Sequence, residues 1–245
     1  MRRALSQSWG IVLLFAAWQI YVMAMHYNSI VIVTPVAVFE DIALHPGVYA
    51  ASTLWTVGFA LAGLAGGLVI GVTLAVAAWS SRFLSGVISP VALLLSSTPV
   101  VCLIPLMARI FGYRSSTELV TVIILTFFPA FVFAASGLRR LPPMSDELFA
   151  VFAASPLKRL WLLALPSAAP SLAAALRVCA AYSVLVTMVA EYLMQTGGLG
   201  NMFALMSQEF QTERAFGASV LAMAVSTALY SAAGVIETRV QARFL

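Results

Sequence analysis

The sequence predicts an all-α integral membrane protein with about six transmembrane helices and both termini in the cytoplasm. Of its 245 residues, 62% are apolar and only 9% are charged, whereas soluble domains carry about 25% charged residues. The mean hydropathy is +1.01, and apolar stretches of the length that a bilayer requires recur along the chain. So few charges cannot cover a globule of this size, which excludes a soluble enzyme.

The first predicted span runs from Trp9 to Tyr27, after Arg2-Arg3. A basic start before an apolar stretch also fits a signal peptide, but this stretch is long and lacks a small-residue cleavage site, so we expect a retained helix. The mixed segment from Val36 to Leu44 lies between turn signals and predicts an element at the membrane interface. The second span runs from Ala51 to Trp79.

Four further stretches complete the set. The third, from Phe83 to Phe111, is too long for one straight crossing and carries three prolines, which predicts a kinked helix or two segments. The fourth span is Glu118 to Leu138, the fifth Pro166 to Ala190 and the sixth Ala215 to Ile236. The polar stretch between the last two spans, Glu191 to Arg214, predicts an outer connection with a short helix.

The basic residues set the orientation of these spans, because cytoplasmic loops are enriched in lysine and arginine. With the N-terminus inside, nine of the 13 basic residues lie on the inner side: Arg2, Arg3, Arg82, Arg139, Arg140, Lys158, Arg159, Arg239 and Arg243. Only Arg114 and Arg214 lie on the outer side. No internal repeat is visible, so residues 1–245 are expected to form a single transmembrane domain.

Small residues recur in the second span, where Gly63, Gly67 and Gly71 are spaced four apart. This spacing places them on one helix face and allows close approach of a second backbone in lipid. Packing within the chain is the first expectation, and a dimer contact or a pathway lining is the alternative.

The inside segment 144–165 carries the clearest local signals. Ser145 is placed to cap a helix that begins with Asp146-Glu147, since acidic residues suit a helix N-terminus. Ser155-Pro156 predicts the start of a second short helix. Leu165-Pro166 is expected to break that helix before the fifth span.

This segment also carries more apolar side chains than it can cover itself, namely Leu148, Phe149, Val151 and Phe152. An exposed apolar patch normally marks a partner surface. The alternatives are that the segment lies on the inner leaflet or packs beneath the helix bundle.

The chain carries no signal for ATP hydrolysis or metal binding. Its single lysine, Lys158, follows no glycine-rich loop, so the phosphate-binding pattern G-x-x-x-x-G-K-[ST] is absent. The two cysteines, Cys102 and Cys179, and the two histidines, His26 and His45, lack metal-site spacing. We therefore expect no catalytic, metal or cofactor site on this chain, and we interpret its net charge of +4 as a topology signal rather than a nucleic-acid signal.

The inside segment resembles the signature loop of permease subunits of binding-protein-dependent ABC importers, which reads E-A-A-x-x-x-G and closes with L-P. Glu147 stands at the acidic position, and Leu165-Pro166 closes the pattern at the expected distance. Leu148-Phe149 replaces the two alanines, and Ala153 stands at the glycine position. Alanine there is harmless at negative φ, but it adds about 1 kcal/mol of strain at positive φ.

The similarity extends over nearly the whole chain and looks like the nitrate, sulfonate and taurine permeases. The stretches that carry it, together with Arg177, are Thr34-Pro35, Ser52-Thr53-Leu54, Ser97-Thr98-Pro99, Ile104-Pro105-Leu106, Phe111-Gly112, Val189-Ala190-Glu191 and Gly198-Leu199-Gly200. Permeases for thiamine precursors and riboflavin are similar too. A small anionic solute is therefore the first expectation, while the match leaves the solute's identity open.

The resemblance implies a type I importer permease in the bacterial inner membrane, with ATP and magnesium on separate cytoplasmic ATPase subunits. It implies an extracytoplasmic binding protein as a further partner, and a second permease copy that makes a homodimer. The signature loop would be a coupling helix that inserts into the ATPase. Its expected coupling residues are Asp146, Glu147, Phe149, Phe152, Ala153, Ser155, Lys158, Leu165 and Pro166.

Six residues are candidates for the translocation pathway: Pro99, Pro105, Arg109, Arg177, Tyr182 and Glu191. The prolines free backbone carbonyls that are tolerated where they line a cavity, and a plain kink is the alternative. Arg109 reaches the outer headgroups or an anionic solute, while Arg177 faces a cavity or pairs with an acid. Glu191 is a gating acid or an ordinary interface residue.

Two rival functions make different demands on the sequence. An ion-gradient-driven carrier or channel needs intramembrane acids or histidines along an ion path, of which the chain has few. An intramembrane serine protease needs a serine and a histidine deep in facing helices, but His26 and His45 lie near predicted outer ends. The permease therefore remains the first expectation, with the carrier as the alternative.

Overall fold

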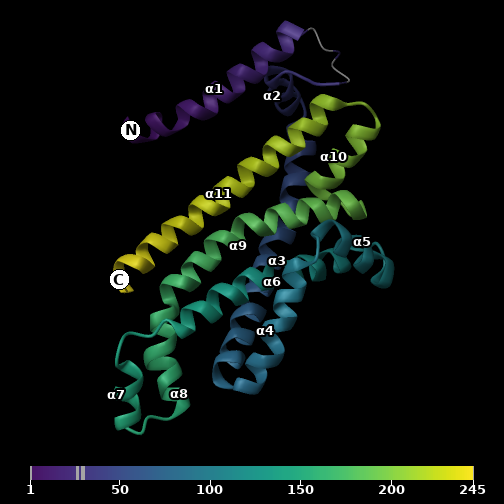
Figure 1. Cartoon of the computed structure of the whole chain (residues 1–245). Helices are drawn as coiled ribbons and strands as arrows, with labels where there is room; N and C mark the ends of the chain where they lie inside the picture. Colours follow the sequence, from purple (N-terminus) through teal and green to yellow (C-terminus); the bar gives the residue numbers. More distant parts are fainter. Residues whose placement is uncertain (1, 26–27, 29–30, 245) are drawn as a thin grey trace.

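The computed structural model describes residues 2–25, 28 and 31–244, and the side chains of a few further residues, Asp146 among them, lie outside that description. Within the described ranges all regular structure is helical (Figure 1). The helices are α1 Arg2–Met25, α2 Pro35–Leu44, α3 Pro46–Ser80, α4 Arg82–Ser97, α5 Val100–Phe111, α6 Ser115–Arg139, α7 Ser145–Val151, α8 Pro156–Arg159, the π-helical turn η1 Leu160–Ala164, α9 Leu165–Met194, α10 Gly198–Gln208 and α11 Thr212–Phe244.

Four helical stretches are long and apolar enough to cross a membrane: α3, α6, the continuous stretch Pro156–Met194 and α11. Helices α4 and α5 are bent by 101° relative to each other and together make a fifth apolar unit. The apolar part of α1, Val12–Met25, is shorter. The third predicted stretch is therefore two segments, because Thr98 and Pro99 take extended backbone angles that end α4.

Helices α3, α6 and α9 form the packed centre of the bundle, and the glycines of α3 bring it together with α6. A Cβ atom added at Gly63 would collide with Val122, and one added at Gly71 would lie 2.7 Å from the Cβ of Ala130. Gly67 approaches Thr126 in the same way. The small-residue face predicted from the four-residue spacing therefore serves packing within the chain.

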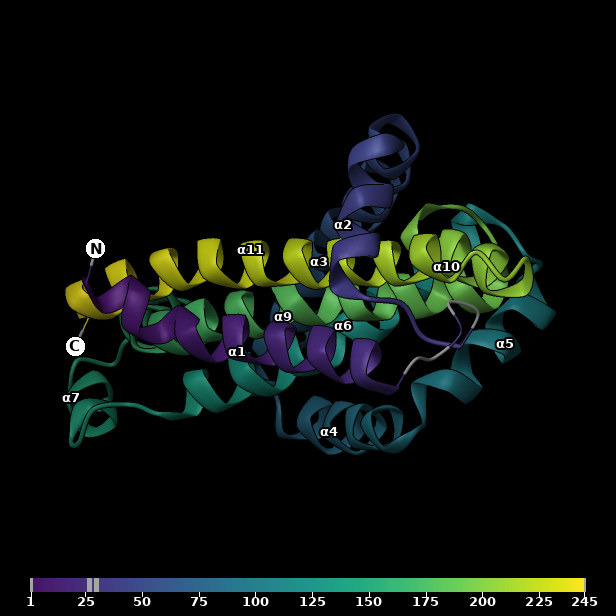
Figure 2. The same cartoon turned by 90° about the horizontal axis from the view of Figure 1, so that it is seen from above.

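The two ends of the bundle differ in character. Both termini and α7 lie at one end, whereas α5 and α10 lie at the other (Figures 1 and 2). The first end carries the basic residues of the terminal helices and of the segment after α6. It is therefore the cytoplasmic end, as the distribution of basic residues predicts.

The predicted helix break at Leu165-Pro166 is wrong. The helix runs without interruption from Pro156 to Met194. The π-helical turn η1 holds one extra residue per turn, and the Leu165 N–H donates to the Leu160 carbonyl. A proline has no N–H to donate and crowds the preceding turn, so a wider turn just before it lets the helix continue.

Candidate functional site

A cavity of about 240 Å³ opens between the α4–α5 bend and the outer halves of α6 and α9. Thr98 and Tyr182 place hydroxyl groups on its wall, and the remaining lining is apolar. The lining residues are Leu95, Thr98, Val100, Leu103, Ile124, Leu125, Phe128, Pro129, Val178 and Tyr182. We call it the outer cavity.

A second cavity, of about 520 Å³, lies on the inner halves of the same two helices and reaches the end of α11. This inner cavity is lined by Val132, Phe133, Ser136, Arg140, Ser167, Pro170, Ser171, Ala174 and Gln241. On α6 the lining passes from Phe128 to Val132, and on α9 from Val178 to Ala174, four residues apart in each case. Residues four apart share a helix face. The two cavities therefore follow one another along one α6–α9 groove.

The structure brings some of the predicted pathway residues to this groove. Tyr182 lines the outer cavity, and Pro99 lies between two of its lining residues. Pro105 and Arg109 lie on exposed positions of α5, a few residues after Leu103, which lines the outer cavity. Thr98 was not among the predicted pathway residues, although it lies in the visible Ser97-Thr98-Pro99 break, and Arg140 was interpreted only as a topology signal.

Arg177 lies on α9 but forms a contact with α11 instead of lining either cavity. Its Nη1 atom lies 2.9 Å from Glu237 Oε2, and its guanidinium stacks 4.1 Å from the ring centroid of Tyr230. Of the two expected environments for Arg177, the structure therefore shows pairing with an acid.

Glu191 is fully buried and joins three helices at the outer end of the bundle. The Thr56 hydroxyl of α3 lies 2.8 and 2.9 Å from its two carboxyl oxygens. The Gly200 N–H donates to Oε2 at 2.9 Å, and the Leu199 N–H donates to the Thr56 hydroxyl at 2.9 Å. Glu191 and Thr56 thereby satisfy free N–H groups at the start of α10, which have no partner within their own helix. We call this contact the Glu191–Thr56 lock.

A second buried acid lies near the lock on α6. Glu118 has no exposed surface, and among the described residues its carboxyl oxygens form no hydrogen bond of regular geometry, although the Thr196 hydroxyl lies nearby. Glu118 and Glu191 are therefore both buried, but the Glu191 carboxyl accepts several hydrogen bonds, whereas the Glu118 carboxyl lacks such partners.

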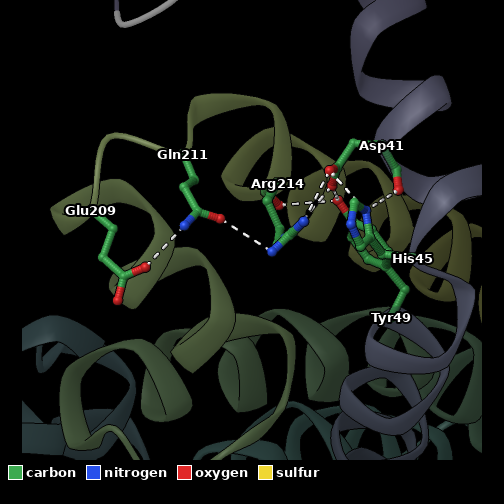
Figure 3. A network of polar contacts seen from close by, with 6 residues as sticks. All are labelled: Asp41, His45, Tyr49, Glu209, Gln211 and Arg214. Atoms are coloured by element: carbon green, nitrogen blue, oxygen red, sulfur yellow. Dashed lines mark hydrogen bonds and ion pairs between the residues drawn. The ribbon is translucent and has the colours of Figure 1, made fainter.

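A polar network at the outer surface fastens α2 to the bundle (Figure 3). Arg214 of α11 pairs with Asp41 at 3.1 Å, and the Tyr49 hydroxyl donates to Asp41 Oδ2 at 2.7 Å. His45 Nδ1 lies 3.1 Å from Asp41 Oδ1. Partial burial of Asp41 raises its pKa, but the hydrogen bonds from Arg214 and Tyr49 and the positive charge of Arg214 outweigh it, so the pKa is lower than usual.

The inside segment forms a short hairpin of α7 and α8 below the bundle (Figure 1). Ser155 caps α8 as predicted, accepting from the Lys158 N–H at 3.4 Å. The predicted cap at Ser145 is wrong, because its hydroxyl donates to the Pro142 carbonyl at 2.6 Å instead. Glu147 and Lys158 are exposed, and the Asp146 side chain lies outside the described part of the chain.

Residues 148–162, which run from α7 through α8 into η1, expose six large apolar side chains, which we call the apolar patch: Leu148, Val151, Phe152, Leu157, Trp161 and Leu162. Val151 is 82% exposed and Phe152 75% exposed. Phe149 is only half-buried by its own chain. Trp161 and Leu162, which lie in the predicted second short helix of the inside segment, were not among the side chains predicted to be exposed.

The turn after α7 explains why a small residue stands there. Ala153 has φ = 46°, and the Ala154 N–H donates to the Phe149 carbonyl at 3.1 Å. This is the pattern of a helix end in which one residue adopts the left-handed conformation, where glycine is most common. Of the two conformations left open for Ala153, the structure therefore has the strained one.

Leu165 and Pro166 are half-buried at the top of the hairpin, where α9 begins. Within the described ranges, no group of three histidine, cysteine, aspartate or glutamate side chains is placed to hold a metal ion.

Comparisons with known proteins agree with this architecture. Residues 67–243 match the model of the family described as binding-protein-dependent transport system inner membrane component. A probable ABC transporter permease protein of Haemophilus influenzae is 26% identical over 89% of this chain and 89% of its own length. The formylaminopyrimidine transport permease ThiX of Halalkalibacterium halodurans is 28% identical over 60% of this chain and 59% of its own.

The taurine transport permease TauC of Escherichia coli is 24% identical over 55% of this chain and 49% of its own length. Among solved structures, the inward-facing MetNI methionine ABC transporter superposes with a TM-score of 0.70 at 18% identity. That match covers 79% of this chain and 96% of the other. At this identity the structural match establishes the fold.

Proposed function

The chain belongs to the family of binding-protein-dependent transport system inner membrane components, and we propose that its α6–α9 groove is one half of the path by which a small solute enters the cell. It is the permease subunit of an ABC importer and not itself an enzyme. The observation that supports the path is the succession of the outer and inner cavities on a single face of α6 and α9.

The apolar patch is the proposed joint with the ATPase. It lies at the cytoplasmic end, where its large side chains are 55–82% exposed, and burying one such side chain contributes about 1.5–3 kcal/mol. Glu147 and Lys158 border it with charges of opposite sign. ATP and magnesium would act on that separate subunit, whose closure would pull on α9 through the continuous helix from Pro156.

A second copy of the chain is the proposed partner within the membrane. Neither cavity is enclosed by one protomer alone, whereas two facing grooves would enclose a solute between them. Among the α1 side chains that the structure describes, Val22 is buried against its own protomer and most of the apolar ones are exposed, to lipid or to the second copy. An extracytoplasmic binding protein would deliver the solute to the end that carries α5 and α10.

Two solute classes follow from the relatives and from the groove. A small solute that carries an anionic group, such as a sulfonate, nitrate or taurine, is supported by Arg109 on α5 and Arg140 in the inner cavity, since neither has an ion pair among the described residues. A flat neutral heterocycle is favoured by the outer cavity, where Phe128 and Tyr182 lie among apolar side chains without a charge. Taurine and a formylaminopyrimidine represent the two classes.

The test is reconstitution of the chain with the ATPase and binding protein from its own operon in liposomes. We expect uptake of one of these solutes that requires both ATP and the binding protein. Uptake driven by an ion gradient without ATP would contradict the proposal and support the carrier. Titration of the isolated binding protein with taurine and with the pyrimidine decides between the solute classes.

A further inference from the structure

The inner cavity is unusually rich in hydrogen-bond donors. Three helices and their ends contribute five polar side chains to it: Ser136 of α6 and Arg140 directly after that helix, Ser167 and Ser171 from α9, and Gln241 from α11. Within the described residues, the three serine hydroxyls form no hydrogen bond to protein. Serine hydroxyls in helices commonly bond a carbonyl of the preceding turn, so three free hydroxyls facing one space are available for another partner.

The positive charge of this cavity is also unbalanced. Arg140 ends α6 and has no ion pair among the described residues. The nearest acid along the lining helices, Glu237, is already engaged, because Arg177 donates to one of its oxygens at 2.9 Å and Gln241 to the other at 3.2 Å. Arg139 differs, since it points elsewhere and donates to Ser85 at 2.9 Å.

We propose that the inner cavity binds one oxyanion group (a phosphate, sulfonate or carboxylate) through the Arg140 guanidinium and the hydroxyls of Ser136, Ser167 and Ser171. A guanidinium offers a planar fork that matches such a group, and each hydroxyl can donate to one of its oxygens. Charge-assisted hydrogen bonds of this kind are about twice as strong as neutral ones.

Two kinds of molecule can bring an oxyanion group to the inner cavity. One is the phosphate of an inner-leaflet phospholipid, since basic pockets between transmembrane helices on the cytoplasmic side bind anionic headgroups. The other is the anionic group of a solute leaving the groove, and only this source rests on the proposed function. Binding can be measured without transport, so failure of uptake and failure of anion binding are separate results.

The experiment compares wild type, Arg140→Gln and Arg139→Gln in nanodiscs of phosphatidylcholine, with or without phosphatidylglycerol. Thermal unfolding is followed while phosphatidylglycerol, sulfate or taurine is titrated, and native mass spectrometry counts retained lipids. We expect saturable stabilisation of wild type, with anion affinity roughly tenfold weaker in Arg140→Gln and unchanged in Arg139→Gln. Ser171→Ala, which keeps every charge, should weaken binding by a smaller factor.

The outcome also identifies the source. Stabilisation by phosphatidylglycerol alone assigns the site to a lipid, and stabilisation by sulfate or taurine in phosphatidylcholine assigns it to a solute. The proposal is overturned if no anion stabilises wild type more than Arg140→Gln. It is equally overturned if Arg139→Gln loses as much affinity, because surface charge alone would then explain the effect.

Discussion

Replacing Glu191 should weaken the attachment of α10 to the transmembrane helices. In Glu191→Ala, the Thr56 hydroxyl loses both carboxyl contacts, at 2.8 and 2.9 Å, and the buried Gly200 N–H loses its acceptor. The Thr56 hydroxyl has a single hydrogen to donate, so losing its carboxyl partner costs about 1 kcal/mol, and the buried Gly200 N–H left without an acceptor costs about 1–3 kcal/mol. We therefore expect the free energy of unfolding to fall by about 2–4 kcal/mol.

The structure provides a matched control in Glu118, which is equally buried but forms no hydrogen bond of regular geometry with the described residues. Glu118→Gln should change the free energy of unfolding by less than about 1 kcal/mol, whereas Glu191→Gln keeps one acceptor and should lose about 1–2 kcal/mol. Thermal unfolding in nanodiscs measures the three variants, and Glu191→Ala should lower Tm by roughly 10 °C. Equal Tm values for Glu191→Ala and Glu118→Gln would refute the lock.

Three further predictions concern single positions. Gly198→Ala should prevent folding, because Gly198 has φ = 75° and a Cβ there would overlap the Glu191 carboxyl. Gly58→Ala is the control, because Gly58 has open space around it, and this variant should elute as a folded protein in size-exclusion chromatography. Ala153→Gly should stabilise the chain by about 1 kcal/mol, because glycine adopts the positive φ without strain; an unchanged or lower Tm would contradict this. The pKa of Asp41 is lowered in the folded chain, so its stabilising contribution is complete above about pH 4 and is lost as the pH falls through the lowered value. The Tm difference between wild type and Asp41→Asn should therefore be constant near neutral pH and shrink in acid, and a difference that grows in acid would be inconsistent.

Much of the fold could be predicted because the bilayer imposes strong rules on composition. The lengths of the apolar stretches predicted the long helices, and the basic residues of the loops predicted their orientation. The four-residue glycine spacing identified the packing face of α3. The predicted helix break at Leu165-Pro166 is wrong because a proline disrupts only a regular α-helical turn, and the wider π-helical turn η1 accommodates it.

The site was less predictable because it depends on which side chains meet across helices. Tyr182 was chosen for its hydroxyl and does line the outer cavity. The contacts of Glu191 with Thr56 join residues that are 135 positions apart, so no local sequence pattern predicts them. In the sequence Arg140 was only one of nine inner charges, because two of the three serines that accompany it in the inner cavity, Ser167 and Ser171, come from a different helix.

The central claim is that the apolar patch couples this chain to an ATPase. The most direct measurement is copurification of the ATPase with the chain, together with ATP-dependent uptake, for wild type, Phe152→Asp and Glu147→Arg. Leu44→Asp is the control for ATPase retention, because Leu44 is 75% exposed, as is Phe152, but lies on α2 at the opposite end. The account predicts that the two hairpin variants fold but lose the ATPase or the uptake that its hydrolysis drives. Wild-type ATPase binding and uptake in both variants would contradict it.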